Sequence, residues 1–211
     1  MLNKKILFRR ILPALLLTSL FITFVLIYFN KQANIALKDA DFKLMKFKGG
    51  QFTNKDLIGK PSIIFFGFLN CPDICPSSLQ LLSNLIDDLG MSSNKINFYF
   101  VSVDPERDSL AMMRDYLGSF NSNIVGISGE KKELKKLYKV FGIYAKKVSI
   151  DKDNYTVDHT ASLMVLNQSG LKVGELLHED FSKFIVLDNF GKILEPKKQV
   201  KENLQKLLNI N

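Results

Sequence analysis

The chain has 211 residues, which allows one or two domains, and 46% of them are hydrophobic, which is enough for a substantial core. The formal net charge is +8, but residues 1–31 hold five basic residues and no acidic one, which leaves +3 for the rest. So small a basic excess gives no reason to expect nucleic-acid binding, and we interpret it as a solvated lysine-rich surface.

An apolar segment at residues 11–29 is the first feature along the chain. It holds 19 residues without a charge, which as a helix would be about 28 Å long and would cross a bilayer. Lys4, Lys5, Arg9 and Arg10 precede it, so we expect residues 1–31 to be a cytoplasmic tip and a transmembrane anchor, with all later residues outside. The length of the span and the lack of a small-residue cleavage site favour an uncleaved anchor, and a cleaved signal peptide is the alternative.

A polar tether at residues 32–41 is predicted to connect the anchor to a folded domain at residues 42–211. The domain begins with a predicted hairpin over residues 42–53, whose turn contains Gly49 and Gly50.

The stretch from Pro61 to Pro76 reads PSIIFFGFLNCPDICP. Its apolar first half predicts a strand that is buried on both faces. Pro76 opens a predicted helix that ends near Gly90. Cys71 and Cys75 therefore lie where a central strand meets the first turn of a helix, and there the unpaired N–H groups and the helix dipole favour a thiolate.

The rest of the chain alternates strands with helices. The further predicted elements are strands at residues 96–103, 124–127, 143–150 and 161–166, a helix whose N-cap is Asp108 or Ser109, and helices at residues 130–141 and 197–209. This alternation predicts an α/β fold with a mixed, mainly parallel sheet flanked by helices. A dithiol between a strand and the next helix of such a sheet is the thioredoxin arrangement, with its site beyond the carboxyl ends of the strands.

Cys71 and Cys75 are the only cysteines in the chain, and their spacing makes them face the same way on a helical turn. A disulfide that encloses three residues closes almost no chain and contributes little stability, so redox or metal chemistry is favoured over a structural bridge. Dithiol oxidoreductases use C-x-x-C. The wider C-x-x-x-C leaves room for a metal ion, and two thiolates suit Cu(I) or zinc together with a third ligand.

The chain has two histidines, His159 and His178, as candidates for that third ligand. His159 precedes an apolar strand at the position that faces the cysteine loop in thioredoxin-like folds. Thioredoxin-like oxidoreductases carry a cis-proline there, whereas this chain has no proline between Pro105 and Pro196. The pattern favours a Cys₂His metal site, with His178 interpreted as a solvated side chain. Asp158 either orients the imidazole or simply ends a strand.

Four stretches together resemble the SCO/SenC family of copper-binding proteins for cytochrome c oxidase assembly. They are GKP at residues 59–61, FGF leading into CPDICP at 66–76, VDPERD at 103–108 and VDHT at 157–160. The resemblance covers roughly residues 42–170 and the N-terminal anchor. It implies a thioredoxin-like fold with an inserted hairpin, and it implies that Cys71, Cys75 and His159 are copper ligands.

The resemblance also implies a function and its partners. It implies delivery of copper to, or reduction of cysteines in, the dinuclear copper site of cytochrome c oxidase subunit II, and we favour a copper metallochaperone over an enzyme. The alternatives are a membrane-anchored thiol–disulfide reductase, with Cys71 and Cys75 as its redox dithiol, and a redox sensor. A thiol reductant or a copper donor protein is an expected partner. The leader is too short for a mitochondrial transit peptide, so we expect a single-pass protein of the bacterial inner membrane with its C-terminal domain in the periplasm.

Residues 175–196 depart from the family pattern, in which one hairpin leads directly to the final helix. A strand, a polar turn and a glycine at residues 163–170 recur in kind at 184–191. We interpret residues 175–196 as a candidate insertion, and an extra hairpin or chance similarity are the alternatives. Because the segment is apolar, we expect it to pack as a strand or short helix on the edge of the domain.

Overall fold

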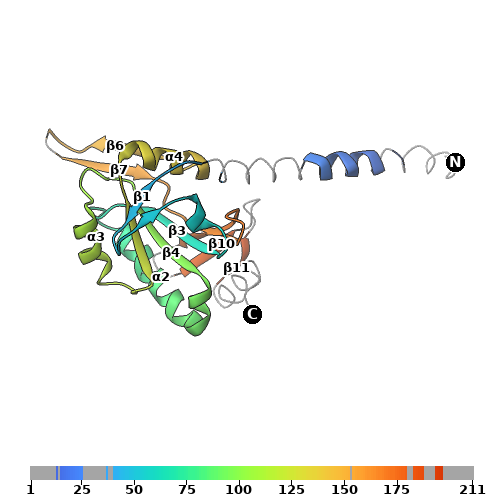
Figure 1. Cartoon of the computed structure of the whole chain (residues 1–211). Coiled ribbons are helices and arrows are strands. Elements are labelled where there is room, and N and C mark those ends of the chain that lie inside the picture. Colours follow the sequence, from blue (N-terminus) through green and yellow to red (C-terminus); the bar gives the residue numbers. More distant parts are fainter. Residues whose placement is uncertain are drawn as a thin grey trace.

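The computed structural model describes residue 13, residues 15–25, residue 37 and residues 40–152, 154–179, 183–187 and 193–196. Figure 1 shows a layered α/β domain in which helices pack on a central sheet. The helix predicted at residues 197–209 lies outside the described residues.

The centre of the sheet consists of three parallel strands, β3 (Ser62–Gly67), β4 (Asn97–Ser102) and β5 (Ile124–Ser128). Phe65 of β3 lies beside Phe100 of β4 in the parallel register. Every residue of β3 is buried, as expected for a strand that is covered on both faces. The apolar runs in the sequence therefore predicted these strands to within about two residues at each end.

Three helices flank the strands, α2 (Ile74–Leu89), α3 (Leu110–Leu117) and α4 (Lys131–Phe141). Helix α2 begins two residues before the predicted start at Pro76. This proline lies in the first turn, where its missing N–H costs no intrahelical hydrogen bond. Ser109, one of the two predicted caps, is the N-cap of α3.

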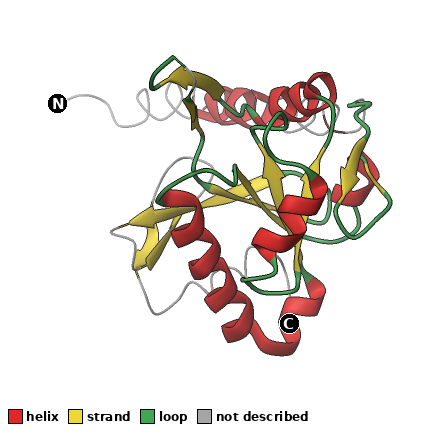
Figure 2. Ribbon diagram, turned by 90° about the vertical axis from the view of Figure 1, so that its left-hand side faces the viewer, coloured by secondary structure: helices red, strands yellow, loops and turns green. Residues whose placement is uncertain are grey.

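Helices lie on both faces of the sheet (Figure 2). Phe66 of β3 contacts Tyr138 of α4 edge to face, with the ring centroids 6.0 Å apart. The next residue, Gly67, faces the side chain of Cys75 in α2. Because adjacent residues of a strand point to opposite faces, α2 and α4 cover opposite faces of β3.

The pairing is antiparallel on both sides of this parallel centre. Beyond β5 lies the predicted hairpin, β1 (Leu44–Lys46) and β2 (Gln51–Phe52). Beyond β3 follow, in order, β8 (Leu163–Leu166), β9 (Lys172–Glu179), β10 (Lys183–Leu187) and β11 (Ile193–Pro196). The described residues also include two 3₁₀ helices, η1 (Asn54–Leu57) and η2 (Gly90–Lys95). The predicted α/β fold with a mixed sheet is confirmed. The prediction of a mainly parallel sheet holds only for the centre, because just β3–β4 and β4–β5 pair in parallel, while the added hairpins at both edges make the other pairings of the described sheet antiparallel.

The candidate insertion at residues 175–196 contains the second half of β9 and the strands β10 and β11. Its backbone extends the sheet at one edge, in the order β11-β10-β9-β8, so the expectation of strands packed on the edge of the domain is confirmed. That this segment was inserted into the family pattern stays a prediction.

A separate two-stranded sheet consists of β6 (Ala145–Ser149) and β7 (Tyr155–His159), which pair in antiparallel fashion. The sequence predicted β6 but gave no strand pattern for β7. The pair agrees with the inserted hairpin that the family resemblance implied. It is important for the site because β7 ends at His159.

The predicted membrane anchor at residues 11–29 is only partly described. Residues 15–25 are helical, and their large apolar side chains are exposed, Leu17 by 68%. Within the described residues no helix is both long and apolar enough to cross a membrane. The anchor therefore stays a prediction.

The packing of the core predicts the effect of truncating Phe65. This side chain is fully buried, and its ring centroid lies 5.9 Å from that of Phe100. Phe65→Ala should lower the free energy of unfolding by about 3–5 kcal/mol, because it removes buried apolar surface and leaves a cavity. Chemical denaturation of the two proteins measures the difference. Met91→Ala is the control, since Met91 is 88% exposed and its loss should change the value by less than about 0.5 kcal/mol. A loss below about 1 kcal/mol for Phe65→Ala would contradict this packing.

Candidate metal centre

The two cysteines are held at the junction of β3 and α2. After Gly67 the chain turns, with the N–H of Cys71 donating to the carbonyl of Phe68 at 3.3 Å. Cys75 is the second residue of α2, so its side chain has the fixed direction of a first helical turn. The thiols are unbridged, with Cys71 half-buried and Cys75 buried.

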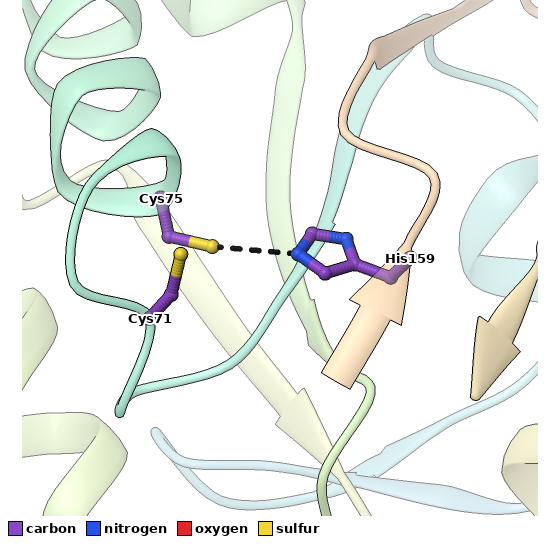
Figure 3. A group of neighbouring side chains, drawn as sticks. All are labelled: Cys71, Cys75 and His159. Atoms are coloured by element: carbon purple, nitrogen blue, oxygen red, sulfur yellow. Dashed lines mark hydrogen bonds between the residues drawn. The ribbon is translucent and has the colours of Figure 1, made fainter. Parts of the chain in front are cut away.

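His159 meets the two cysteines from the end of β7. Figure 3 shows its ring pointing at the thiols from the opposite side. Cys75 Sγ lies 3.8 Å from His159 Nε2, and the donor atoms of Cys71, Cys75 and His159 all lie within 4.8 Å of one another. The structure thus brings together the three residues predicted as ligands, and they could hold one metal ion. His178 lies in β9, and its side chain is outside the described part of the structure.

Gly67 makes room for the Cys75 sulfur. A Cβ atom at this position would lie 3.0 Å from Cys75 Sγ and 2.8 Å from Cε2 of Phe100. Both distances are shorter than van der Waals contact, so any side chain here would displace the thiol or the ring. A glycine is therefore required at position 67, because the Cys75 thiol and the Phe100 ring approach its backbone closely.

The imidazole of His159 is oriented by its neighbour. Its Nδ1 lies 2.9 Å from the carbonyl oxygen of Thr160, and because a carbonyl only accepts, Nδ1 carries the proton. Nε2 then directs its lone pair toward the cysteines, which is the tautomer that a metal ligand requires. Asp158 is exposed and pairs through its backbone with Lys146, so the Thr160 carbonyl takes the orienting role considered for that carboxylate.

The two thiols have opposite pKa shifts. The pKa of Cys71 falls to about 4, chiefly because the Cys75 thiol donates a hydrogen bond to it; burial opposes the shift, while the backbone N–H groups of Asp73 and Cys75 support it. The pKa of Cys75 rises, because the same hydrogen bond holds its proton and because the thiol is buried. The pair therefore shares one proton, with the thiolate at Cys71.

Comparison with known proteins identifies the family. A model of the SCO1/SenC family matches residues 30–191. The chain belongs to the SCO1/SenC family. The family resemblance found in the sequence is thus confirmed, and with it the thioredoxin-like fold.

Relatives within this family include proteins solved with copper. Bradyrhizobium japonicum ScoI with copper bound has a TM-score of 0.65 and 34% identity, covering 79% of this chain and 97% of that one. Yeast Sco1 with copper bound has a TM-score of 0.59 and 35% identity, covering 67% and 81%. Protein SCO2 homolog, mitochondrial, from Danio rerio is 35% identical over 140 residues, which are 65% of this chain and 50% of that protein. The chain thus spans about half the length of this relative.

Asp108, in the VDPERD stretch of this SCO1/SenC chain, supports the cysteine loop. It is buried and accepts hydrogen bonds from the Ser102 hydroxyl at 2.6 Å and from the N–H of Leu69 at 3.3 Å. Burial raises the pKa of Asp108 to about 6 in spite of these hydrogen bonds. Sequence reasoning treated Asp108 only as a possible helix cap and missed this long-range contact.

Arg107, in the same VDPERD stretch, connects the cysteine loop to the hairpin that carries His159. Its guanidinium lies 3.7 Å from the centre of the Tyr155 ring and 5.9 Å from that of Phe68, and it donates to the Tyr155 carbonyl at 3.0 Å. It also forms an ion pair with buried Asp104, which accepts a hydrogen bond from the Tyr155 hydroxyl at 2.8 Å. The Phe68 ring in turn contacts His159 edge to face, with the centroids 5.6 Å apart. The arginine therefore ties β7 to the cysteine loop.

The shared proton predicts how the rate of alkylation of Cys71 depends on pH. Since the pKa of Cys71 is lowered to about 4, its thiolate should persist from neutral pH down to about pH 5, and iodoacetamide should alkylate it there at a nearly constant rate. An ordinary thiol would lose about tenfold per pH unit over that range. Mass spectrometry of quenched samples measures the rate.

Cys75→Ala provides the matched control. The variant removes the S–H donor, so the pKa of Cys71 should rise and its alkylation near pH 6 should slow. Equal rates in the variant and the parent chain would show that the Cys75 thiol is not the cause of the shift.

Proposed function

We propose that this chain is a membrane-anchored copper metallochaperone that delivers copper to the dinuclear copper site of cytochrome c oxidase subunit II. The observation that carries the proposal is the convergence of Cys71, Cys75 and His159, with all donor atoms within 4.8 Å, in a member of the SCO1/SenC family. Solved relatives with copper bound support it.

The donor set fits a copper ion. Two thiolates are soft ligands that suit Cu(I), and an imidazole also accepts Cu(II). Nε2 of His159 is free to bind because Nδ1 donates to the Thr160 carbonyl. Three protein ligands leave a coordination position for a group from the receiving protein, which a carrier needs if it is to release its cargo by ligand exchange.

The setting that we propose is the outer face of a bacterial inner membrane. The basic residues before the apolar segment at 11–29 support a cytoplasmic N-terminus and a periplasmic domain. Because copper binding needs both thiols reduced, a thiol reductant and a copper donor protein belong to this proposal as partners.

The second candidate is a thiol–disulfide reductase, and the pKa of Cys71 favours it. In this reaction the Cys71 thiolate attacks one sulfur of a partner disulfide and releases the other as a thiol. Cys75 then displaces the partner, so that the partner gains two electrons and this chain is left with a Cys71–Cys75 disulfide. A dithiol reductant must return those electrons. This exchange needs only the two thiols, whereas a metal site needs the third donor that His159 supplies, which is why we place copper binding first.

The proposal predicts the copper stoichiometry. The reduced chain should bind one Cu(I), and the Cys71–Cys75 disulfide form should bind none, because the disulfide consumes both thiolate ligands. Anaerobic titration against a chromophoric Cu(I) chelator measures the uptake of both forms. Equal uptake by the oxidised form would exclude the dithiolate site.

Transfer is then tested with the copper-loaded chain and the reduced, copper-free soluble domain of subunit II. Two chains should each deliver one Cu(I) to subunit II, and removal of one electron with a one-electron oxidant such as ferricyanide should then develop the colour of the mixed-valence dinuclear copper site. Copper that stays on the chain while subunit II disulfides become reduced would favour the reductase.

Substitution of the two histidines should affect copper affinity differently. His159→Ala removes one of three ligands and should weaken Cu(II) retention by at least about tenfold, with a smaller effect on Cu(I), because Cu(II) prefers an imidazole. His178→Ala is the matched control, and its affinity should stay within about twofold of the parent chain. Equilibrium dialysis against a competing chelator gives both affinities, and equal behaviour of the two variants would exclude His159 as the third ligand.

A further inference from the structure

A groove of about 600 Å³ lies between α4, the β6–β7 hairpin and the loop after β4. Figure 1 shows the hairpin beside α4. Val157, in the middle of β7, lines the groove two residues before His159. One strand therefore borders both the groove and the candidate metal centre.

Positive charge surrounds this groove. Lys131, Lys135 and Lys139 are four residues apart along α4 and so share one face of the helix. Lys146 and Lys147 of β6 also line the groove. Lys147 is paired with Val157 and shares its face of the hairpin, whereas the side chain of Lys146 leaves the strand on the other face. Two separate elements thus direct lysines to one concave surface.

The lysines are only partly neutralised. Among the described residues that line the groove, Glu106 is the one carboxylate. It forms ion pairs with Lys131 at 3.2 Å and with Lys147. No ion pair joins the other three lysines to a described residue. The groove therefore keeps a clear positive excess.

The surface between the lysines is apolar. Val103, Tyr138, Ile143 and Val157 contribute to it. The Tyr138 hydroxyl donates to the carbonyl of Ser102 at 2.6 Å, so the one polar atom of this side chain is already paired within the domain. A complementary ligand has negative groups at its edges and apolar groups between them.

We propose that this groove binds an acidic segment of a partner protein, with glutamate or aspartate side chains at the lysines and apolar side chains on the floor. This inference rests on the proposed function in one respect, which is that the partner is a protein that exchanges copper at the neighbouring candidate metal centre. The shape favours a protein segment over a membrane, because headgroups present their charge on a broad surface and do not reach the floor of a groove.

The test uses the full chain and a fluorescent peptide of about ten residues that alternates glutamate with leucine. Two triple lysine-to-glutamine variants have the same net charge. The groove variant changes Lys131, Lys135 and Lys139 of α4, and the control variant changes the exposed residues Lys55, Lys132 and Lys152. We expect the groove variant to bind the peptide about tenfold more weakly and the control less than about twofold more weakly, with affinity falling as salt rises.

Three outcomes would overturn the proposal. They are an equal loss in both variants, equal binding of a peptide with glutamine in place of glutamate, and groove-dependent binding of anionic phospholipid vesicles without groove-dependent binding of the peptide. Cu(I) uptake is measured in the same proteins and should be equal in both variants and the parent chain. If the parent chain takes up no copper while the peptide still distinguishes the variants, the docking groove stands and the proposed function fails.

Discussion

The candidate centre depends on one long-range contact, between the Cys75 thiol and the His159 imidazole. These residues are 84 positions apart, yet Sγ and Nε2 lie 3.8 Å from each other. The thiol is held by the first turn of α2, and the ring is held by its hydrogen bond to the Thr160 carbonyl. The donors are therefore positioned by the fold itself, and little ordering remains for the step in which a metal binds.

The loop after β4 supports both sides of that contact. Asp108 holds the cysteine loop through the N–H of Leu69, while Arg107 holds the hairpin through Tyr155. Buried charges are costly unless they are paired and hydrogen-bonded, and Asp104 pairs with this arginine inside the structure. The loop after β4 is thus the brace between the two halves of the site.

The dithiol can serve a metal or a disulfide, but not both at once. One proton is shared between Cys71 and Cys75, so the first thiolate forms readily and the second with difficulty. A bound cation changes this balance, because its charge compensates the second thiolate. Since a disulfide removes both ligands, the redox state of the pair decides whether copper can bind. The lysine groove beside β7 adds a surface by which a partner could be recognised at the same place.

The sequence by itself determined the central strands, the helices that follow them and the types of donor at the site. A strand buried on both faces needs an apolar residue at every position, which makes β3 and β4 visible as continuous runs, and the helical period marks α2 and α4 in the same way. Strand β7 was not predicted, because its polar residues show no clear period. Only the tertiary structure decided which histidine nitrogen faces the thiols, that Asp108 and Arg107 brace the site, and that lysines of α4 and β6 surround one groove. Each of these features depends on the distance between residues far apart in the chain, and local sequence patterns carry no such distances.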